Sequence, residues 1–162
     1  MKKIAKTNAA RLLDRAHVKY ELIPYPVDEN ELGAQHIIDT LGEEAGRVFK
    51  TLVLQGDKTG HFVCVIPGLE EVDLKKAAKV SGNKKCDLIH MKELLPTTGY
   101  IRGGCSPVGM KKPFPTYFDH SCTDYDYIYV SAGQRGLQLK IIPSDLIDYV
   151  GASTADLTIE KQ

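Results

Sequence analysis

The sequence has no apolar run long enough to cross a bilayer, because its longest apolar stretches fall far short of the ~20 residues that a membrane-spanning helix needs. The basic residues near its beginning, Lys2, Lys3 and Lys6, are not followed by an apolar segment, so we do not expect a secretory signal. These two absences predict a cytoplasmic protein that does not act on a membrane.

No Cys-x-x-Cys pair occurs among the four cysteines, which are Cys64, Cys86, Cys105 and Cys122. Without a signal or such a pair, free thiols are expected rather than disulfides. A metal site is not expected either, because His61 and Cys64 fall on opposite faces of one predicted strand and the pair His120 and Cys122 has no second matching pair. We therefore expect neither a metal nor another cofactor.

The chain also lacks a Gly-x-Ser-x-Gly elbow and a recognisable Ser-His-Asp arrangement, which are signatures of serine hydrolases. No internal repeat, low-complexity segment or linker divides its 162 residues. Residues 1–162 are therefore predicted to form a single domain.

Acidic residues are absent from two stretches, Leu74–Cys86 and Leu94–Phe118, although the formal net charge of the chain is zero. Such segregation can present a positive face to a polyanion. The lysines that we consider for contact with a nucleic-acid backbone are Lys75, Lys76, Lys79, Lys84, Lys85, Lys111 and Lys112. The simpler alternative is that these side chains form solvated helix and loop surfaces.

Caps and apolar spacing predict five helices: one after Thr7, Ala34–Leu41, Asp73 to about Val80, His90–Leu95, and Pro143 to about Val150. Runs of β-branched and aromatic residues predict strands at Tyr20–Tyr25, Val48–Leu54, His61–Ile66, Thr116–Phe118, Tyr125–Val130 and Leu137–Ile142. The second and third of these strands should form a hairpin. Without a βαβ rhythm, the pattern indicates an α+β fold with a mixed, largely antiparallel β-barrel of about six to seven strands flanked by helices.

Lys50 occupies an unusual position for a charged residue. By the two-residue period of a strand it shares a face with Val48, Leu52 and Leu54. A lysine on an apolar face is unfavourable unless its ammonium reaches water, a counter-charge or a ligand. Lys50 is thus a candidate functional residue, and the alternative is a surface lysine on an edge strand whose stem passes over Leu52.

Several short motifs follow one another along most of the chain: Phe49-Lys50-Thr51-Leu52, Asp73-Leu74-Lys75-Lys76-Ala77-Ala78-Lys79, Thr98-Gly99-Tyr100, Gly103-Gly104, Ser106-Pro107, Gly109 with Lys111-Lys112, Ile128-Tyr129-Val130-Ser131 and Arg135-Gly136-Leu137. In this order and spacing they resemble the YbaK/EbsC family of Cys-tRNA(Pro) deacylases, relatives of the editing domain inserted in bacterial prolyl-tRNA synthetases. The resemblance implies a mixed β-barrel flanked by helices, and it implies hydrolysis of a mischarged amino acid from the 3′ end of a tRNA.

The resemblance also implies roles for individual residues. It assigns the essential lysine to Lys50 and a glycine of the reaction site to Gly103. The substrate-binding candidates that follow from it are Tyr25, Leu32, Thr51, Gly104, Ser106, Ser131 and Gln138. Two of these depart from the family pattern, since Gln138 stands where a carboxylate is frequent and Leu32 stands where an aromatic residue is frequent. The departures bear on amino-acid selectivity more than on the type of reaction.

The mechanism implied by the resemblance is substrate-assisted, because the cysteinyl thiol attacks its own ester carbonyl. Lys50 would then be an orienting cation, and the backbone N–H groups of Gly103 and Gly104 could approach the ester oxygen; an ordinary turn is the alternative for the two glycines. The expected partner is the acceptor end of an aminoacyl-tRNA, with prolyl-tRNA synthetase as a candidate second partner. The alternative functions are a non-catalytic module that binds tRNA or a synthetase, and a deacylase for another small aminoacyl group such as alanyl.

Overall fold

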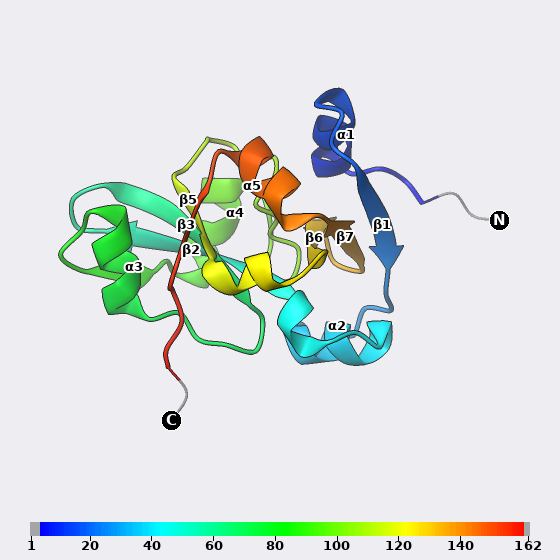
Figure 1. Cartoon of the computed structure of the whole chain (residues 1–162), viewed down its shortest axis with the longest axis horizontal. Coiled ribbons are helices and arrows are strands. Elements are labelled where there is room, and N and C mark those ends of the chain that lie inside the picture. Colours follow the sequence, from blue (N-terminus) through cyan, green and yellow to red (C-terminus); the bar gives the residue numbers. More distant parts are fainter. Residues whose placement is uncertain (1–3, 161–162) are drawn as a thin grey trace.

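The computed structural model describes residues 4–160, which fold into two sheets with helices packed around them (Figure 1). The helices of this part are α1 (Asn8–Arg15), α2 (Ala34–Leu41), α3 (Leu74–Ser81), α4 (Met91–Thr98) and α5 (Pro143–Val150), with two short 3-10 helices, η1 (Ala45–Arg47) and η2 (His120–Asp124). Its strands are β1 (Tyr20–Pro24), β2 (Phe49–Gly56), β3 (Gly60–Pro67), β4 (Cys86–Leu88), β5 (Thr116–Asp119), β6 (Ile128–Gln134), β7 (Leu137–Ile141) and β8 (Ser153–Ala155). None of the helices in the described part has the length and apolar character that crossing a membrane requires.

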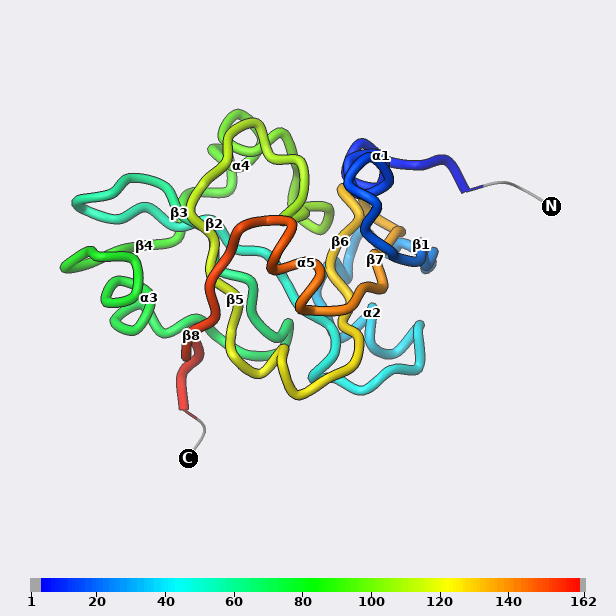
Figure 2. The backbone as a smooth tube through the Cα atoms, turned by 45° about the horizontal axis from the view of Figure 1, so that its top comes forward, coloured from blue at the N-terminus to red at the C-terminus, as the bar shows by residue number. Residues whose placement is uncertain are grey.

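The strands divide into a three-stranded sheet, in the order β1-β7-β6, and a five-stranded sheet, in the order β4-β2-β3-β5-β8. The pairs β3–β5 and β5–β8 are parallel and the other pairs are antiparallel. Figure 2 shows α5 in front of the region between the two sheets. The chain continues from α5 into β8. The prediction of a mixed, largely antiparallel α+β fold is confirmed.

A closed barrel is not found among the described strands. The two sheets meet through one isolated parallel bridge, between Val48 and Tyr129, rather than through a continuous ladder. Closing a barrel requires hydrogen-bonded pairing all around the sheet. One bridge does not supply this, and the strands separate beyond it.

Strand β2 and the residue directly before it, Val48, contribute to all three clusters of buried apolar side chains. Phe49 and Val53 belong to the largest cluster, which includes Phe118 of β5. Leu54 packs in a second cluster beneath α3, and Val48 packs in a third beneath α2. Both faces of β2 are therefore buried along much of its length, which explains why it reads as an almost continuous apolar run.

Helix boundaries follow the local chemistry that the sequence indicates. The side chain of Thr7 accepts a hydrogen bond from the N–H of Ala10, and that of Asp73 accepts from the N–H groups of Lys75 and Lys76. Gly42 ends α2 with a left-handed φ of 65°, a conformation that glycine adopts without strain. The predicted span of α2 is confirmed.

Helix α4 continues through Pro96, where we predicted it to end. A proline removes only its own N–H from the helix, and the neighbouring bonds remain. Glu93 accepts from the N–H of His90 at the start, and the N–H of Gly99 donates to the carbonyl of Leu95 at the end. These contacts at both ends of a short helix outweigh the missing bond.

Strand β6 begins at Ile128 rather than at Tyr125. The guanidinium of Arg47 donates from Nη1 to Asp126 at 2.7 Å and to the carbonyl of Tyr127 at 3.1 Å. A side chain from a distant segment thereby satisfies the carbonyl of Tyr127. The strand ladder therefore starts at Ile128, the residue after it. The sequence shows the tyrosines but not this partner.

Two three-residue strands, β4 and β8, were not predicted because they are too short to show a period. The C-terminal segment with β8 is held by Asp119, whose Oδ1 accepts from the N–H of the buried Leu157 at 3.0 Å. The Oδ2 of Asp119 accepts from the backbone N–H and the hydroxyl of Ser121. One buried carboxylate thus joins the end of β5 to the segment that follows β8.

Replacing Asp119 by Ala should lower the free energy of unfolding by about 2–3 kcal/mol, because the buried N–H of Leu157 loses its acceptor. Urea denaturation measures the change. Asp124→Ala, which removes an exposed carboxylate, is the matched control and should stay within about 0.5 kcal/mol of the parent protein. Equal effects of the two substitutions would contradict the role given to Asp119.

Candidate functional site

A cavity of about 390 Å³ lies along the outer edge of β2. Strand β2 pairs with β3 along its whole length, but on its other side it pairs with β4 only at Leu54–Gly56. The bridge from Val48 to Tyr129 covers the opposite end of that side. Between these contacts no described strand pairs with the outer edge at Lys50–Leu52, and the cavity occupies the gap.

Several other segments complete the cavity wall, including Gly68 after β3. The segment Leu32–Ala34 and Ile37 of α2 lie on one side. Ser131 of β6 and Gln138 of β7 contribute polar groups, and the loop after α4 contributes Arg102, Gly103 and Cys105. The segment Leu88–Met91 and Leu94 close the remaining side with mostly apolar groups. The cavity is therefore apolar with a few polar groups, as small-molecule sites usually are.

Lys50 lines this cavity and shares its strand face with Val48, Leu52 and Leu54, as the sequence predicts. Burial lowers the pKa of Lys50, and the carboxylates of Glu71 and Glu70 oppose part of that shift. These acids favour the ammonium form, which suits a cation that binds an oxygen ligand better than a general base.

Gly103 lines the cavity with a left-handed φ of 84°. A Cβ at this position would lie 3.3 Å from Nε of Arg135, whose own N–H donates to the carbonyl of Arg102 at 2.9 Å. Glycine is therefore favoured by the backbone conformation, and a side chain here would also crowd Arg135. The arrangement presents bare backbone to the cavity.

Three predicted substrate-binding residues do not line the cavity. Tyr25 packs edge-on against His36, with ring centroids 6.3 Å apart. Gly104 donates its N–H to the carbonyl of Ile101, and a Cβ there would lie 3.0 Å from Cα of Gln134. Ser106 is fully buried and accepts from the N–H of Val108. In these positions the three residues shape the loops around the cavity, and the N–H of Gly104 is already used.

Thr51 and Gln138 carry buried polar atoms that lack a partner. Within the described residues, Oγ1 of Thr51 and Oε1 of Gln138 are the buried side-chain oxygens without a hydrogen bond, and both residues line the cavity. Gln138 lies directly opposite Ser131 in the β6–β7 ladder. Unpartnered buried polar atoms are unfavourable in a free protein, so their presence in one cavity points to recognition of a ligand.

The cavity also contains residues that sequence reasoning did not select, above all Arg102, His90, Met91 and Leu94. Arg102 directly precedes the two glycines, and Met91 and Leu94 are spaced so as to share a helix face, but neither pattern stands out among many like it.

Cys105 is the thiol of the cavity, and burial raises its pKa to about 12. It therefore stays protonated near neutral pH and is a poor nucleophile.

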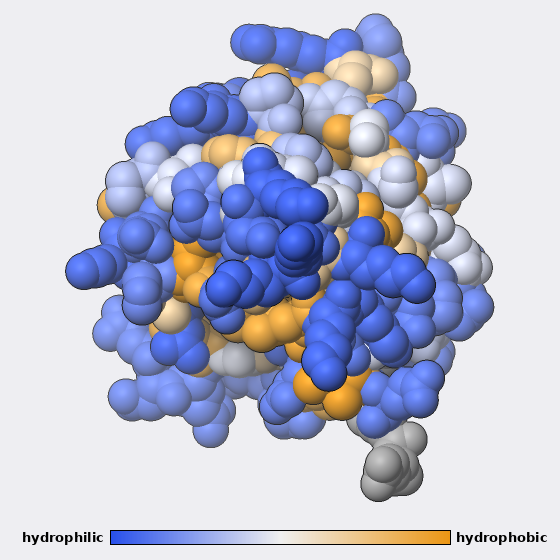
Figure 3. Space-filling model, turned by 90° about the vertical axis from the view of Figure 1, so that its left-hand side faces the viewer, coloured by the Kyte–Doolittle hydropathy of each residue, from blue (hydrophilic) through white to orange (hydrophobic). Residues whose placement is uncertain are grey.

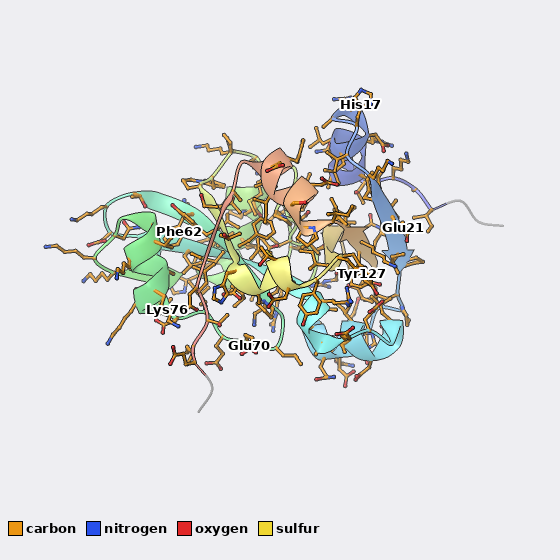
Figure 4. All side chains as sticks on the ribbon, in the orientation of Figure 1. His17, Glu21, Phe62, Glu70, Lys76 and Tyr127 are labelled. Carbon is orange, nitrogen blue, oxygen red and sulfur yellow. The ribbon has the colours of Figure 1, made fainter. Side chains whose placement is uncertain are left out.

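The lysines selected as contacts for a nucleic-acid backbone lie outside the cavity wall and differ in their surroundings. Figure 3 views the end that carries α3 and the β2–β3 hairpin, where hydrophilic residues cover most of the face and Lys75, Lys79, Lys84 and Lys85 are exposed. Lys76 instead donates to Asp156 and to the carbonyl of Thr158, both at 2.9 Å, and so ties α3 to the C-terminal segment (Figure 4). Lys111 and Lys112 are exposed in the loop after α4, where Lys111 donates to the carbonyl of Pro96.

One group of potential metal ligands occurs within residues 4–160, consisting of Asp119, His120 and Asp156, whose ligand atoms lie within 4.8 Å of one another. Both oxygens of Asp119 already accept hydrogen bonds from Ser121 and Leu157, and Asp156 forms an ion pair with Lys76. The donor atoms of this group are thus used within the fold, and we assign no metal to it.

Comparison with known proteins gives consistent similarities. A family model described as an aminoacyl-tRNA editing domain matches residues 28–149. A protein of Enterococcus faecalis, provisionally named Cys-tRNA(Pro)/Cys-tRNA(Cys) deacylase EbsC, is 48% identical over 156 residues, which cover 96% of this chain and 95% of that protein. The crystal structure of a proposed trans-editing enzyme for prolyl tRNA synthetase aligns with a TM-score of 0.81 and 26% identity over 96% of this chain and 100% of that one. The hypothetical protein APE2540 shares the fold, with a TM-score of 0.84 and 21% identity over 92% of this chain and 97% of that one.

Replacing Thr51 by Val should raise the free energy of unfolding by about 1 kcal/mol, because it removes a buried hydroxyl that has no partner while keeping the shape of the side chain. Thr116→Val is the matched control, since Oγ1 of Thr116 donates to the carbonyl of Phe114 at 2.9 Å and its loss should destabilise by about 1 kcal/mol. Urea denaturation of both variants provides the comparison. A loss of stability in Thr51→Val would show that its hydroxyl has a structural partner.

Proposed function

Because this chain belongs to the aminoacyl-tRNA editing domain family, we propose that it is a trans-editing deacylase that hydrolyses mischarged tRNA(Pro), with Cys-tRNA(Pro) as its main substrate. The provisional name of the Enterococcus faecalis relative contains this substrate, and the solved neighbour is described as a trans-editing enzyme for prolyl tRNA synthetase. The observation that carries the proposal is that Lys50, Gly103 and Ser131 line one cavity although they are far apart in the sequence.

The cationic groups of the cavity suit the phosphate-bearing end of a tRNA. Lys50 orients the terminal adenosine by binding a phosphate or the ester carbonyl oxygen, which an ammonium does through charge-assisted hydrogen bonds. Arg102, at the cavity wall, adds a second positive charge. Gly103 lets the ester approach the backbone closely, because no Cβ intervenes.

The cavity supplies position and charge rather than a side-chain nucleophile. Its thiol, Cys105, is held protonated by burial. Its serine, Ser131, accepts from the N–H of Gly133, and no histidine of the described residues is hydrogen-bonded to it. In the proposed step the sulfur of the cysteinyl group attacks its own ester carbonyl, a C–S bond forms, the C–O bond to the ribose breaks, and the thiol proton passes to the departing 3′ oxygen. Water then opens the resulting thiolactone to free cysteine. Holding the reacting atoms together accounts for much of such an acceleration.

A second candidate function is binding of a tRNA acceptor end without hydrolysis. Two residues of the cavity wall keep this reading open, since by the family resemblance a carboxylate is expected in place of Gln138 and an aromatic residue in place of Leu32. Turnover of Cys-tRNA(Pro), Ala-tRNA(Pro) and Ser-tRNA(Pro) separates the two functions. Release of amino acid from any of them supports deacylation and identifies the preferred aminoacyl group, whereas tight binding without release supports the second candidate.

The exposed lysines are proposed as contacts to the tRNA backbone outside the cavity. Lys111 and Lys112 lie in the loop after α4, the helix whose Met91 and Leu94 line the cavity, so they are well situated for the acceptor stem. Lys75 and Lys79 extend the basic surface along α3, whereas Lys76 is engaged by Asp156 and contributes less. Prolyl-tRNA synthetase is a further proposed partner, on the strength of the name of the solved neighbour alone.

Replacing Lys50 by Met should reduce deacylation of Cys-tRNA(Pro) by at least about 100-fold, because the orienting charge is lost while the apolar stem remains. The melting temperature should be unchanged or higher, since a charge leaves an apolar strand face. Lys140→Met is the matched control: its ammonium stacks on Tyr127 at 4.2 Å outside this cavity, and its activity should be close to that of the parent. Turnover by Lys50→Met near the parent rate would refute the role assigned to Lys50.

The double substitution Lys111→Ala and Lys112→Ala should weaken tRNA binding and lower the slope of log affinity against log salt concentration by about 2, because each lost phosphate contact removes about one released counterion. Filter binding over a range of salt concentrations measures the slope. Lys19→Ala, an exposed lysine before β1, is the control and should leave it unchanged. An unaltered slope in the double variant would contradict phosphate contacts by Lys111 and Lys112. The double variant of Lys75 and Lys79 would then test the other exposed lysines.

A further inference from the structure

Two residues of the cavity wall each carry a buried polar atom that lacks a hydrogen-bond partner in the described structure. The described part of the chain buries Oγ1 of Thr51 and Oε1 of Gln138 without giving either a hydrogen bond. Gln138 is 2% exposed, so water does not readily compensate its carbonyl oxygen. Such atoms are rare in folded proteins, and two of them on one cavity indicate that a ligand completes their hydrogen bonds.

Ser131 adds a third neutral group at the same location. It is paired with Gln138 across the β6–β7 ladder, so the two side chains stand side by side on one face of that sheet, with Cβ atoms about 5 Å apart. The oxygen of Ser131 accepts from the N–H of Gly133 at 3.1 Å, which leaves its O–H free to donate. Thr51 approaches from β2, which continues beyond the Val48–Tyr129 bridge in the same direction as β6.

The charges around this group are cationic. The cavity wall includes the cations Lys50 and Arg102 but no aspartate or glutamate. The carboxylates of Glu71 and Glu70 act on Lys50 but are not part of the wall. A cationic ligand group would therefore lie beside the like charges of Lys50 and Arg102, while these acids already act on Lys50, and this disfavours it in a site of low polarity.

We propose that Gln138, together with Ser131 and Thr51, binds the α-amino group of the aminoacyl ligand in its uncharged form. The amide oxygen of Gln138 accepts an N–H of the amine, and the hydroxyl of Ser131 donates to its lone pair. Thr51 offers a second acceptor for the other N–H. A neutral amine has two donors and one acceptor, which matches this set, whereas an ammonium has three donors and adds a charge to a site that already holds two cations.

The proposal rests on the proposed function, since it assumes an aminoacyl ligand, and it makes Gln138 a determinant of which protonation state binds. A free α-amino group titrates near about 8, so both of its forms are abundant around neutral pH. Affinity should then rise with pH as the amine loses its proton. A carboxylate at the same position would reverse this dependence, because it would select the ammonium.

The test uses two probes that differ only in the amine: the 3′-amide of adenosine with cysteine, which cannot be hydrolysed as an ester, and its counterpart with 3-mercaptopropionate. The ratio of their affinities is measured by calorimetry from about pH 6 to about pH 9, a range that brackets titration of the amine. Taking the ratio removes contributions from the adenosine and from Lys50, because both probes share them, and the S-methyl derivatives of both probes serve as a second pair in which no thiol can ionise. For the parent protein the preference for the amine should grow at least about tenfold across this range.

Gln138→Leu should lower the preference for the amine about tenfold at the upper end and reduce its growth with pH, since Lys50 and Arg102 still disfavour the ammonium. Gln138→Glu, of nearly equal size, should make the preference fall as the pH rises. Ser131→Ala is a further variant with an expected loss of about threefold, in case Gln138→Leu does not keep the parent melting temperature. A ratio that is independent of Gln138, or one that falls with pH in the parent protein, overturns the inference.

The same measurements separate this inference from the proposed function. If no aminoacyl-tRNA is hydrolysed but the ratio depends on pH and on Gln138 as described, the amine site stands and the deacylase assignment fails. If Cys-tRNA(Pro) is hydrolysed and the ratio does not respond to Gln138, the deacylase assignment stands and the amine site fails.

Discussion

The unpaired outer edge of β2 is the constraint on which the site depends. A strand inside a sheet normally has partners on both sides, and here β2 has a full partner only in β3. Its other side is held at one end by Tyr129 and at the other by β4. Because β6 meets this side only at the Val48–Tyr129 bridge and β4 only at the far end, the middle of β2 borders a cavity instead of a strand. The same gap is the reason that the barrel does not close.

This gap makes the position of Lys50 tolerable. Its stem lies among aliphatic side chains of β2, while its ammonium opens onto the cavity under the influence of Glu71 and Glu70. Thr51 and Gln138 add two oxygens without partners in the described structure. A site of this kind costs stability in the free protein, and a ligand that supplies the missing partners restores it.

Local chemistry was enough to predict much of the secondary structure. Thr7 and Asp73 start α1 and α3, Gly42 ends α2, and Gly56 and Gly60 flank the β2–β3 turn, because caps and turns depend on neighbouring residues. Most of the failures have a different cause. Strand β6 begins late because Arg47 takes the carbonyl of Tyr127, and β4 and β8 exist only through pairing with strands that are distant in the sequence. Helix α4 is the exception, since the contacts that secure its two ends around Pro96 are local.

The sequence by itself determined that Lys50 shares an apolar strand face, that the chain has a basic middle section, and that its motifs resemble those of a tRNA-editing family. These conclusions need only the period of a strand, the order of residues and the count of charges. Only the tertiary structure decided which candidates share a cavity: Lys50, Gly103, Ser131 and Gln138 do, whereas Tyr25, Gly104 and Ser106 shape the loops around it. It also decided that two polar atoms are buried without partners. The reason is physical, since burial and hydrogen-bond satisfaction depend on atoms brought together from β2, β6, β7 and the loop after α4, and no local pattern encodes their distances.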